Sequence, residues 1–105
     1  MCGANGVPAA LNGRMISIEP IQRLANADIR SRTLPNIVSG RKGSSQGITE
    51  PSGGSDVAGM KTTARFDGGT YVINGSKAFI TGGMTSDFFV IGAQVGGNGL
   101  ADISL

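Results

Sequence analysis

The apolar positions of this chain change their spacing about halfway along it. Between residues 14 and 34 they recur at intervals that suit a helix, whereas from residue 60 onward they form short runs separated by glycine-rich turns. The pattern predicts one or two short helices followed by strands. We therefore expect a mainly β fold, a small antiparallel barrel or meander that the helices precede.

Two segments are candidates for the helices. Residues 14–24 carry four spaced aliphatic side chains that fit a helix or an extended segment, and Pro20 indicates where a helix would begin or break. Residues 27–34 predict a helix more clearly, with Asn26 as its N-cap and Pro35 as its end.

Turn residues divide the rest of the chain. Residues 40–47 are rich in glycine and serine and predict a polar connector, while Asp67-Gly68-Gly69 and Asn74-Gly75 predict tight turns. The expected strands are 60–66, 71–73, 78–81, 88–93 and 101–105. Three segments follow from this reading: a flexible N-terminus over 1–13, a helical segment over 14–45 and a β domain over 46–105.

Composition limits the size of the core. The chain has 105 residues, of which 18 are glycine and five are aromatic, so one small domain must be built on Ile, Val, Leu, Met and Phe. Residues 1–46 contain six basic and two acidic side chains, and residues 47–105 contain three and five. A solvated helix face explains the basic half better than nucleic-acid binding, because no aromatic residues are interleaved with the charges.

The lone cysteine and the absence of histidine exclude some chemistry. Cys2 has no partner for a disulfide, and without histidine a Cys–His nucleophile is impossible. We expect no metal site, no membrane span and a cytoplasmic location.

Two polar segments could carry a ligand. Residues 48–56 read Ile-Thr-Glu-Pro-Ser-Gly-Gly-Ser-Asp, and residues 74–83 read Asn-Gly-Ser-Lys-Ala-Phe-Ile-Thr-Gly-Gly. The hydroxyls and glycine backbone of the first segment suit a planar heteroatom-rich ring or a pyrophosphate. On composition alone, an ordinary Gly/Ser loop explains the first segment better than a ligand site does, and a strand of core residues explains the second better.

Together the two motifs resemble the FAD-dependent acyl-CoA dehydrogenase family. Residues 46–105 are similar to its middle β-barrel domain, and the helical segment before them is similar to the end of its N-terminal helical domain. The resemblance implies FAD as cofactor and oxidation of acyl-CoA to trans-2-enoyl-CoA in fatty acid β-oxidation. It also implies electron-transfer flavoprotein as partner and a homo-oligomer.

The resemblance assigns cofactor-binding roles to both motifs. In the first motif and just before it, the implied flavin contacts are Gln46, Ile48, Thr49, Gly54 and Ser55, with Ser55 also near the acyl-CoA thioester. In the second they are Phe79, Ile80 and Thr81, with the Thr81 hydroxyl near the redox-active nitrogen. We expect Thr49 and Thr81 to face one groove.

The chain also departs from the family pattern. Gln46 stands where an aromatic residue is common, and Ala25 stands where a helix-ending glycine is usual. The C-terminal helical bundle, which carries the catalytic base, is expected to be missing, and neither Glu19 nor Glu50 is expected to replace that base. No catalytic residue is therefore assigned. A fragment of the enzyme, a non-catalytic binding or interaction module of the same fold, and a poorly folding truncation product stay as alternatives.

Overall fold

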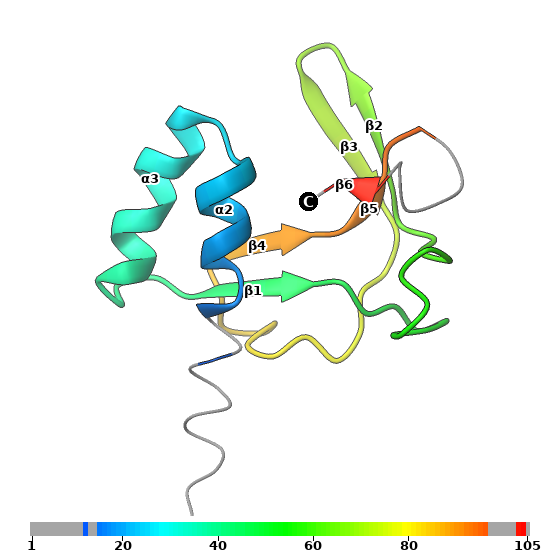
Figure 1. Ribbon diagram of the computed structural model, residues 1–105, viewed down its shortest axis with the longest axis horizontal. Coiled ribbons are helices and arrows are strands. Elements are labelled where there is room, and N and C mark those ends of the chain that lie inside the picture. The colour runs from blue at the N-terminus through cyan, green and yellow to red at the C-terminus, as the bar shows by residue number, and fades with distance from the viewer. Residues whose placement is uncertain (1–11, 13–14, 97–102, 105) are drawn as a thin grey trace, which may run out of the picture. The chain divides into compact units, whose positions relative to one another are not determined.

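A computed structural model of the chain describes residues 12, 15–96 and 103–104 (Figure 1). The chain divides into two compact units. The first unit contains the residues up to Gln46 together with Ile80–Val90, and the second contains Gly47–Phe79 and the residues from Ile91 onward. The N-terminus expected to be flexible, residues 1–13, lies outside the described residues apart from Asn12.

Two helices pack against each other in the first unit. They are α2 (Ile18–Leu24) and α3 (Ala27–Val38) (Figure 1). Pro20 lies in the first turn of α2, where the helix needs no backbone N–H donor, so α2 begins ahead of it. Oδ1 of Asn26 accepts a 2.9 Å hydrogen bond from the backbone N–H of Ile29, which confirms the predicted N-cap of α3.

The predicted end of α3 at Pro35 is wrong, because the helix continues to Val38. A proline within a helix removes the N–H that would bond to the carbonyl four residues earlier, here that of Ser31. Ser31 is exposed and α3 buries none of its residues, so water can bond to that carbonyl. A solvated helix tolerates the proline more easily than a buried one.

The N-cap gives the first testable result. Asn26→Ala should lower the free energy of unfolding by about 1 kcal/mol, because the N–H of Ile29 loses its acceptor. Urea denaturation followed by far-UV circular dichroism measures this change. Asn26→Asp keeps an acceptor oxygen and should retain most of the stability. An equal loss in both variants would contradict the capping role.

A two-stranded sheet lies mainly in the first unit, apart from the last residue of each strand. Its strands are β1 (Ser44–Gly47) and β4 (Phe88–Ile91) (Figure 1). The prediction of a connector over 40–47 is therefore wrong for its second half. Ser44 and Ser45 are buried there, and the hydroxyl of Ser17 donates to that of Ser44 at 2.6 Å. Serine can occupy a buried strand because its hydroxyl finds a partner.

A four-stranded sheet organises the second unit. Its hairpin, β2 (Thr63–Asp67) and β3 (Thr70–Asn74), confirms the turn predicted at Asp67-Gly68-Gly69. β2 also pairs in parallel with β5 (Ala93–Gln94), and β5 pairs in antiparallel with β6 (Ile103–Ser104). The order is β3-β2-β5-β6, which places β3 at an edge. The predicted class, short helices followed by a small β-rich domain, is confirmed.

Three predicted strands differ from the structure. The strand expected over 60–66 begins only at Thr63 and ends at Asp67. Residues 78–81 form no strand: Phe79 has a left-handed φ of 56°, which no strand accommodates, and a turn follows. The strand predicted over 88–93 is divided at Gly92 into β4 and β5. Strand 101–105 is described only as β6, and its other residues lie outside the described part.

Few large apolar side chains are buried. Among the described residues the apolar core comprises Ile21, Met60, Ala64, Val90 and Ala93, with no leucine or phenylalanine. Many large apolar side chains are exposed instead, among them Met15, Leu24, Val38, Phe66, Tyr71 and Met84. The expectation of a core that includes Leu and Phe is therefore wrong, and polar contacts contribute much of the internal structure. No helix in the described part of the chain is long and apolar enough to cross a membrane.

Candidate functional site

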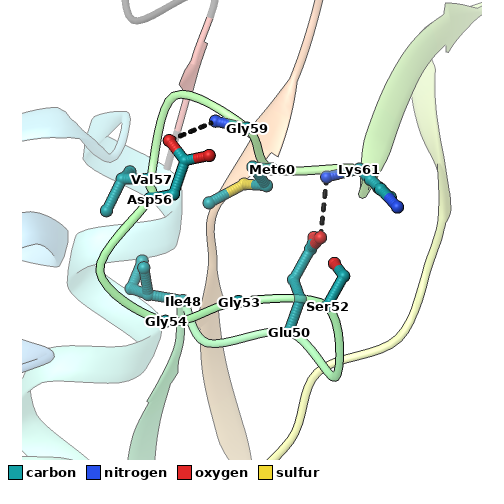
Figure 2. A pocket seen from close by; sticks show the side chains of 10 residues that line it. All are labelled: Ile48, Glu50, Ser52, Gly53, Gly54, Asp56, Val57, Gly59, Met60 and Lys61. Carbon is teal, nitrogen blue, oxygen red and sulfur yellow. Dashed lines mark hydrogen bonds between the residues drawn. The ribbon is translucent and has the colours of Figure 1, made fainter.

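The first motif forms a polar loop around a small hollow in the second unit (Figure 2). Glu50 and Gly53 exchange backbone hydrogen bonds of 3.1 Å in both directions, which closes a tight turn over Pro51 and Ser52. Further along, the Asp56 carboxylate accepts a 3.1 Å hydrogen bond from the N–H of Gly59. The hollow measures about 140 Å³ and is lined by Ile48, Glu50, Ser52, Gly53, Gly54, Asp56, Val57, Gly59, Met60 and Lys61.

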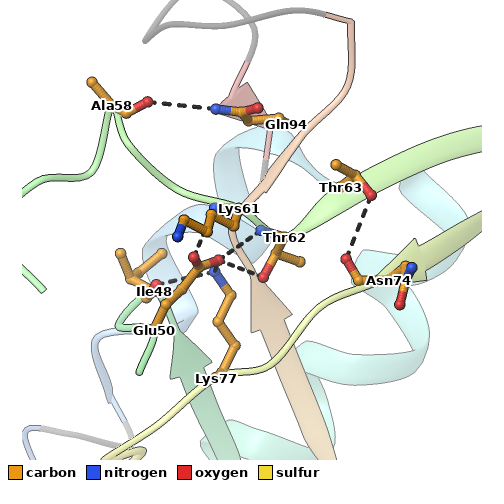
Figure 3. Close-up of polar contacts among 9 residues, drawn as sticks. All are labelled: Ile48, Glu50, Ala58, Lys61, Thr62, Thr63, Asn74, Lys77 and Gln94. Atoms are coloured by element: carbon orange, nitrogen blue, oxygen red, sulfur yellow. Dashed lines mark hydrogen bonds and ion pairs between the residues drawn. The ribbon is translucent and has the colours of Figure 1, made fainter. Parts of the chain in front are cut away.

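The carboxylate of Glu50 is buried and fully bonded (Figure 3). Its Oε2 accepts a 2.7 Å hydrogen bond from the N–H of Lys61, and its Oε1 accepts one of the same length from the N–H of Thr62. The Thr62 hydroxyl also donates to Oε1, and Nζ of Lys77 lies 3.0 Å from it. This arrangement gives Glu50 a structural role, since both of its oxygens accept hydrogen bonds from the protein.

The hydrogen bonds decide the ionisation of this carboxyl. Burial raises the pKa of Glu50, but the bonds from the Thr62 hydroxyl, from the N–H groups of Lys61 and Thr62, and from Lys77 outweigh burial and lower it to about 2. Glu50 is therefore an anion at neutral pH.

This pKa predicts how stability changes in acid. The unfolded chain protonates Glu50 near 4.5 and the folded chain near 2, so protons bind the unfolded state more readily between these values. The free energy of unfolding should fall by about 1–3 kcal/mol as pH drops from about 5 to about 2. Urea denaturation at a series of pH values measures the slope. In Glu50→Gln the slope should become smaller, and an unchanged slope would contradict this origin.

Lys77 makes a second contact with the same loop. Its Nζ donates to the carbonyl of Ile48 at 3.0 Å, and its side chain is only 9% exposed. One ammonium group therefore bonds both to the backbone before Thr49 and to the carboxylate after it. Such a buried lysine requires a partner of this kind, because an unpaired charge is costly to bury.

Thr49 lies between these two contacts. Its carbonyl accepts a 2.9 Å hydrogen bond from the N–H of Ala78, so residues 48–50 run beside residues 77–78. Gly54 lies over the Thr49 methyl group, since a Cβ on Gly54 would be 3.5 Å from it. The Thr49 side chain is half-buried, and its hydroxyl makes no hydrogen bond with any residue that the structure describes.

Phe79 has an unusual conformation for an aromatic residue. It follows Ala78, adopts a φ of 56°, and is 94% exposed as a residue. A left-handed backbone costs a non-glycine residue free energy, and outliers of this kind concentrate at functional sites. Ser55, the remaining predicted residue of this unit, is exposed.

The other predicted residues belong to the first unit. The carbonyl of Thr81 accepts a 2.6 Å hydrogen bond from the hydroxyl of Ser45, and the hydroxyls of Ser45 and Ser86 lie 2.6 Å apart. Because a carbonyl only accepts, Ser86 must donate to Ser45. The carbonyl of Ile80 accepts a 2.9 Å hydrogen bond from the N–H of Gly83. These contacts hold the turn that carries Thr81.

Gln46 lines a different hollow of the first unit. This more apolar space measures about 360 Å³ and lies along α2 beside Ile16, Glu19, Pro20, Arg23 and Leu24. Glu19 is exposed there and forms an ion pair of 3.1 Å with Arg23.

The structure thus brings some of the predicted residues together. Thr49 and Gly54 lie close together, and Thr49 is bonded to the residue before Phe79. A common groove for Thr49 and Thr81 stays a prediction. Sequence reasoning missed Lys77 and Thr62, although the lysine is part of the second motif and a charge next to an apolar run could have drawn attention to it.

A family match covers this site. The sequence model described as "Acyl-CoA dehydrogenase, middle domain" matches residues 45–105, more than half of the chain, and includes both motifs. The chain belongs to the acyl-CoA dehydrogenase family. The predicted resemblance is therefore confirmed.

Individual acyl-CoA dehydrogenases agree with the family match. The chain is 37% identical to acyl-CoA dehydrogenase apdG of Emericella nidulans, over 98% of the chain and 24% of that protein. It is 34% identical to mitochondrial isobutyryl-CoA dehydrogenase of Bos taurus, over 97% of the chain and 24% of that protein. The chain spans about a quarter of the length of the curated relatives it matches.

Solved structures of this family have the same fold. A probable acyl-CoA dehydrogenase from Mycobacterium abscessus superposes with a TM-score of 0.91 at 39% identity, over 98% of this chain and 27% of that one. A glutaryl-CoA dehydrogenase from Mycobacterium smegmatis in complex with FADH2 superposes with a TM-score of 0.72 at 37% identity, over 75% of this chain and 20% of that one.

Proposed function

We propose that this chain supplies the flavin-binding side of an FAD-dependent acyl-CoA dehydrogenase. The observation that carries the proposal is the family match over residues 45–105, because that range contains both motifs to which flavin contacts were assigned. The M. smegmatis relative in complex with FADH2 supports FAD as the cofactor. The reaction of the whole enzyme would convert an acyl-CoA to a trans-2-enoyl-CoA.

The residues present fit the cofactor in their chemistry. A flavin ring offers carbonyl and nitrogen atoms to hydroxyl and backbone donors, and an apolar face to side chains. The half-buried hydroxyl of Thr49 makes no hydrogen bond within the described part of the chain, and the Thr81 side chain is exposed. The ring of Phe79 is also exposed and could pack against a planar group. We assign the flavin contacts to Gln46, Ile48, Thr49, Gly54, Ser55, Phe79, Ile80 and Thr81.

The residues of this chain would bind and orient the flavin and the acyl-CoA. They would not remove the Cα proton of the substrate. Bound FAD would accept the hydride that leaves Cβ of the acyl group while the Cα proton goes to a base. Glu50 is a poor candidate for that base, since the hydrogen bonds it accepts lower its pKa to about 2 and so weaken it as a proton acceptor. Glu19 is exposed and paired with Arg23. No residue of this chain is assigned as the base.

The same proposal includes a substrate, an electron acceptor and an oligomeric state. We assign acyl-CoA as the substrate, with Ser55 near its thioester, and electron-transfer flavoprotein as the electron acceptor in fatty acid β-oxidation. The names of the relatives support an acyl-CoA substrate. A homo-oligomer is part of the proposal.

Titration of the purified protein with FAD tests the proposal. We expect saturable binding, a yellow protein after removal of free cofactor, and a change in the visible flavin bands on adding acyl-CoA. A folded protein that stays colourless and does not bind FAD would instead favour the alternative, a non-catalytic module of the same fold. Thr49→Val, which removes the hydroxyl and keeps the shape, should weaken FAD binding several-fold.

A further inference from the structure

We propose that Glu50, Thr62 and Lys77 form a clasp that positions Thr49 and Phe79 for the flavin. Glu50 and Lys77 are therefore positioning residues for cofactor binding. This inference rests on the proposed function, because it concerns the two segments to which flavin contacts are assigned in the second unit.

Three contacts join these two segments. Nζ of Lys77 bonds to the Ile48 carbonyl and to Oε1 of Glu50, each at 3.0 Å, and the N–H of Ala78 bonds to the Thr49 carbonyl at 2.9 Å. Thr49 is therefore held directly and on both sides, by the two residues that precede Phe79. Figure 3 shows the Lys77 ammonium group reaching between Ile48 and Glu50.

The clasp is anchored on the hairpin. Glu50 accepts hydrogen bonds from the N–H groups of Lys61 and Thr62, just before β2 begins. Gly75, just after β3 ends, lies so close to Thr62 that a Cβ on it would be 2.7 Å from the Thr62 Cα. Both segments are thus fixed to the same end of one hairpin, which the ladder of β2 and β3 stiffens.

Holding these two segments in place is expected to affect ligand binding more than the stability of the fold. A buried ion pair is weak evidence for stability, because desolvation offsets most of the attraction and apolar replacements are often neutral. A fixed loop, in contrast, improves binding by removing the ordering cost of its hydroxyl donor. Thr49 has such a donor without a partner among the described residues, and Phe79 has an exposed ring on a constrained backbone.

Lys77→Met tests the clasp. The variant removes the ammonium group and keeps most of the length, while Glu50 retains its three bonds from Lys61 and Thr62. We expect FAD affinity to fall at least tenfold and the amide of Ala78 to exchange its hydrogen at least tenfold faster, with little change at Ala64 in β2. Arg65→Met is the matched control, because it removes a positive charge from an exposed ion pair with Asp67 on the same hairpin. It should change neither quantity.

The outcomes separate the inference from the proposed function. If the wild-type protein does not bind FAD, the proposed function fails and the inference fails with it. If the wild type binds FAD and Lys77→Met binds equally well, only the inference is overturned. Should Lys77→Met not fold, Glu50→Gln/Lys77→Met removes both charges together, and unchanged FAD affinity in that double variant overturns the inference as well. Lys77→Arg keeps the charge and should restore part of the affinity.

Discussion

Glu50→Gln should lower the free energy of unfolding by about 3–5 kcal/mol, because it leaves the buried Lys77 ammonium group without its counter-charge. The amide also presents an NH2 group where the carboxylate accepted hydrogen bonds from Lys61 and Thr62. The new NH2 group would then face at least one of these N–H donors, and neither could accept a hydrogen bond from the other. Urea denaturation at neutral pH measures the loss.

A second glutamate provides the control for this change. Glu19 forms an exposed ion pair with Arg23, so Glu19→Gln should cost less than about 0.5 kcal/mol. Glu50→Gln/Lys77→Met removes the unpaired charge and should recover part of the loss. Equal stabilities for Glu19→Gln and Glu50→Gln would show that the buried pair contributes nothing beyond an exposed one.

Gly75→Ala should lower the free energy of unfolding by about 2–3 kcal/mol through overpacking. An added Cβ would lie 2.7 Å from Cα and 2.8 Å from Cβ of Thr62, and the backbone of Thr62 cannot move aside without displacing Glu50. Thermal and urea denaturation measure the loss, and amide exchange at Thr62 shows whether its bond to Glu50 loosens.

Gly53→Ala is the matched control for this glycine. A Cβ on Gly53 would meet no atom within 4 Å, so this substitution should change stability by less than about 0.5 kcal/mol. If both glycine variants were equally stable, the close approach of Gly75 to Thr62 would have no energetic consequence.

The elements that were predicted correctly are those that a few consecutive residues determine. Asn26 caps a helix through its own side chain, and Asp67-Gly68-Gly69 turns a hairpin, so both were readable from a few consecutive residues. The helix start near Pro20 followed for the same reason, because a proline restricts only its own turn.

The elements that were wrongly predicted depend on distant partners. Ser44 and Ser45 form a buried strand although the sequence there shows no alternation of apolar and polar residues. Their hydroxyls can be buried because they form hydrogen bonds with the hydroxyls of Ser17 and Ser86. Residues 78–81 are apolar and strand-like, yet the bond from Ala78 to Thr49 and the left-handed Phe79 turn the chain away. Contacts of this kind have no periodic signature.

The same limit applies to the candidate site. The motifs pointed to Thr49 and Phe79 through a family resemblance, but the pair of Glu50 and Lys77 spans 27 positions in the sequence. Only the fold shows that the two charges meet. Glu50 was not expected to replace the catalytic base, and the bonds around its carboxylate indicate a structural role instead.

Folding gains little from the side chain of Phe79. Its ring buries almost no area, and glycine would adopt the same left-handed backbone without the steric cost. A glycine there should fold at least as well, apart from the greater freedom it gives the unfolded chain. The strained backbone at Phe79 thus presents an aromatic side chain to solvent, where packing within the described part of the chain does not compensate for the strain.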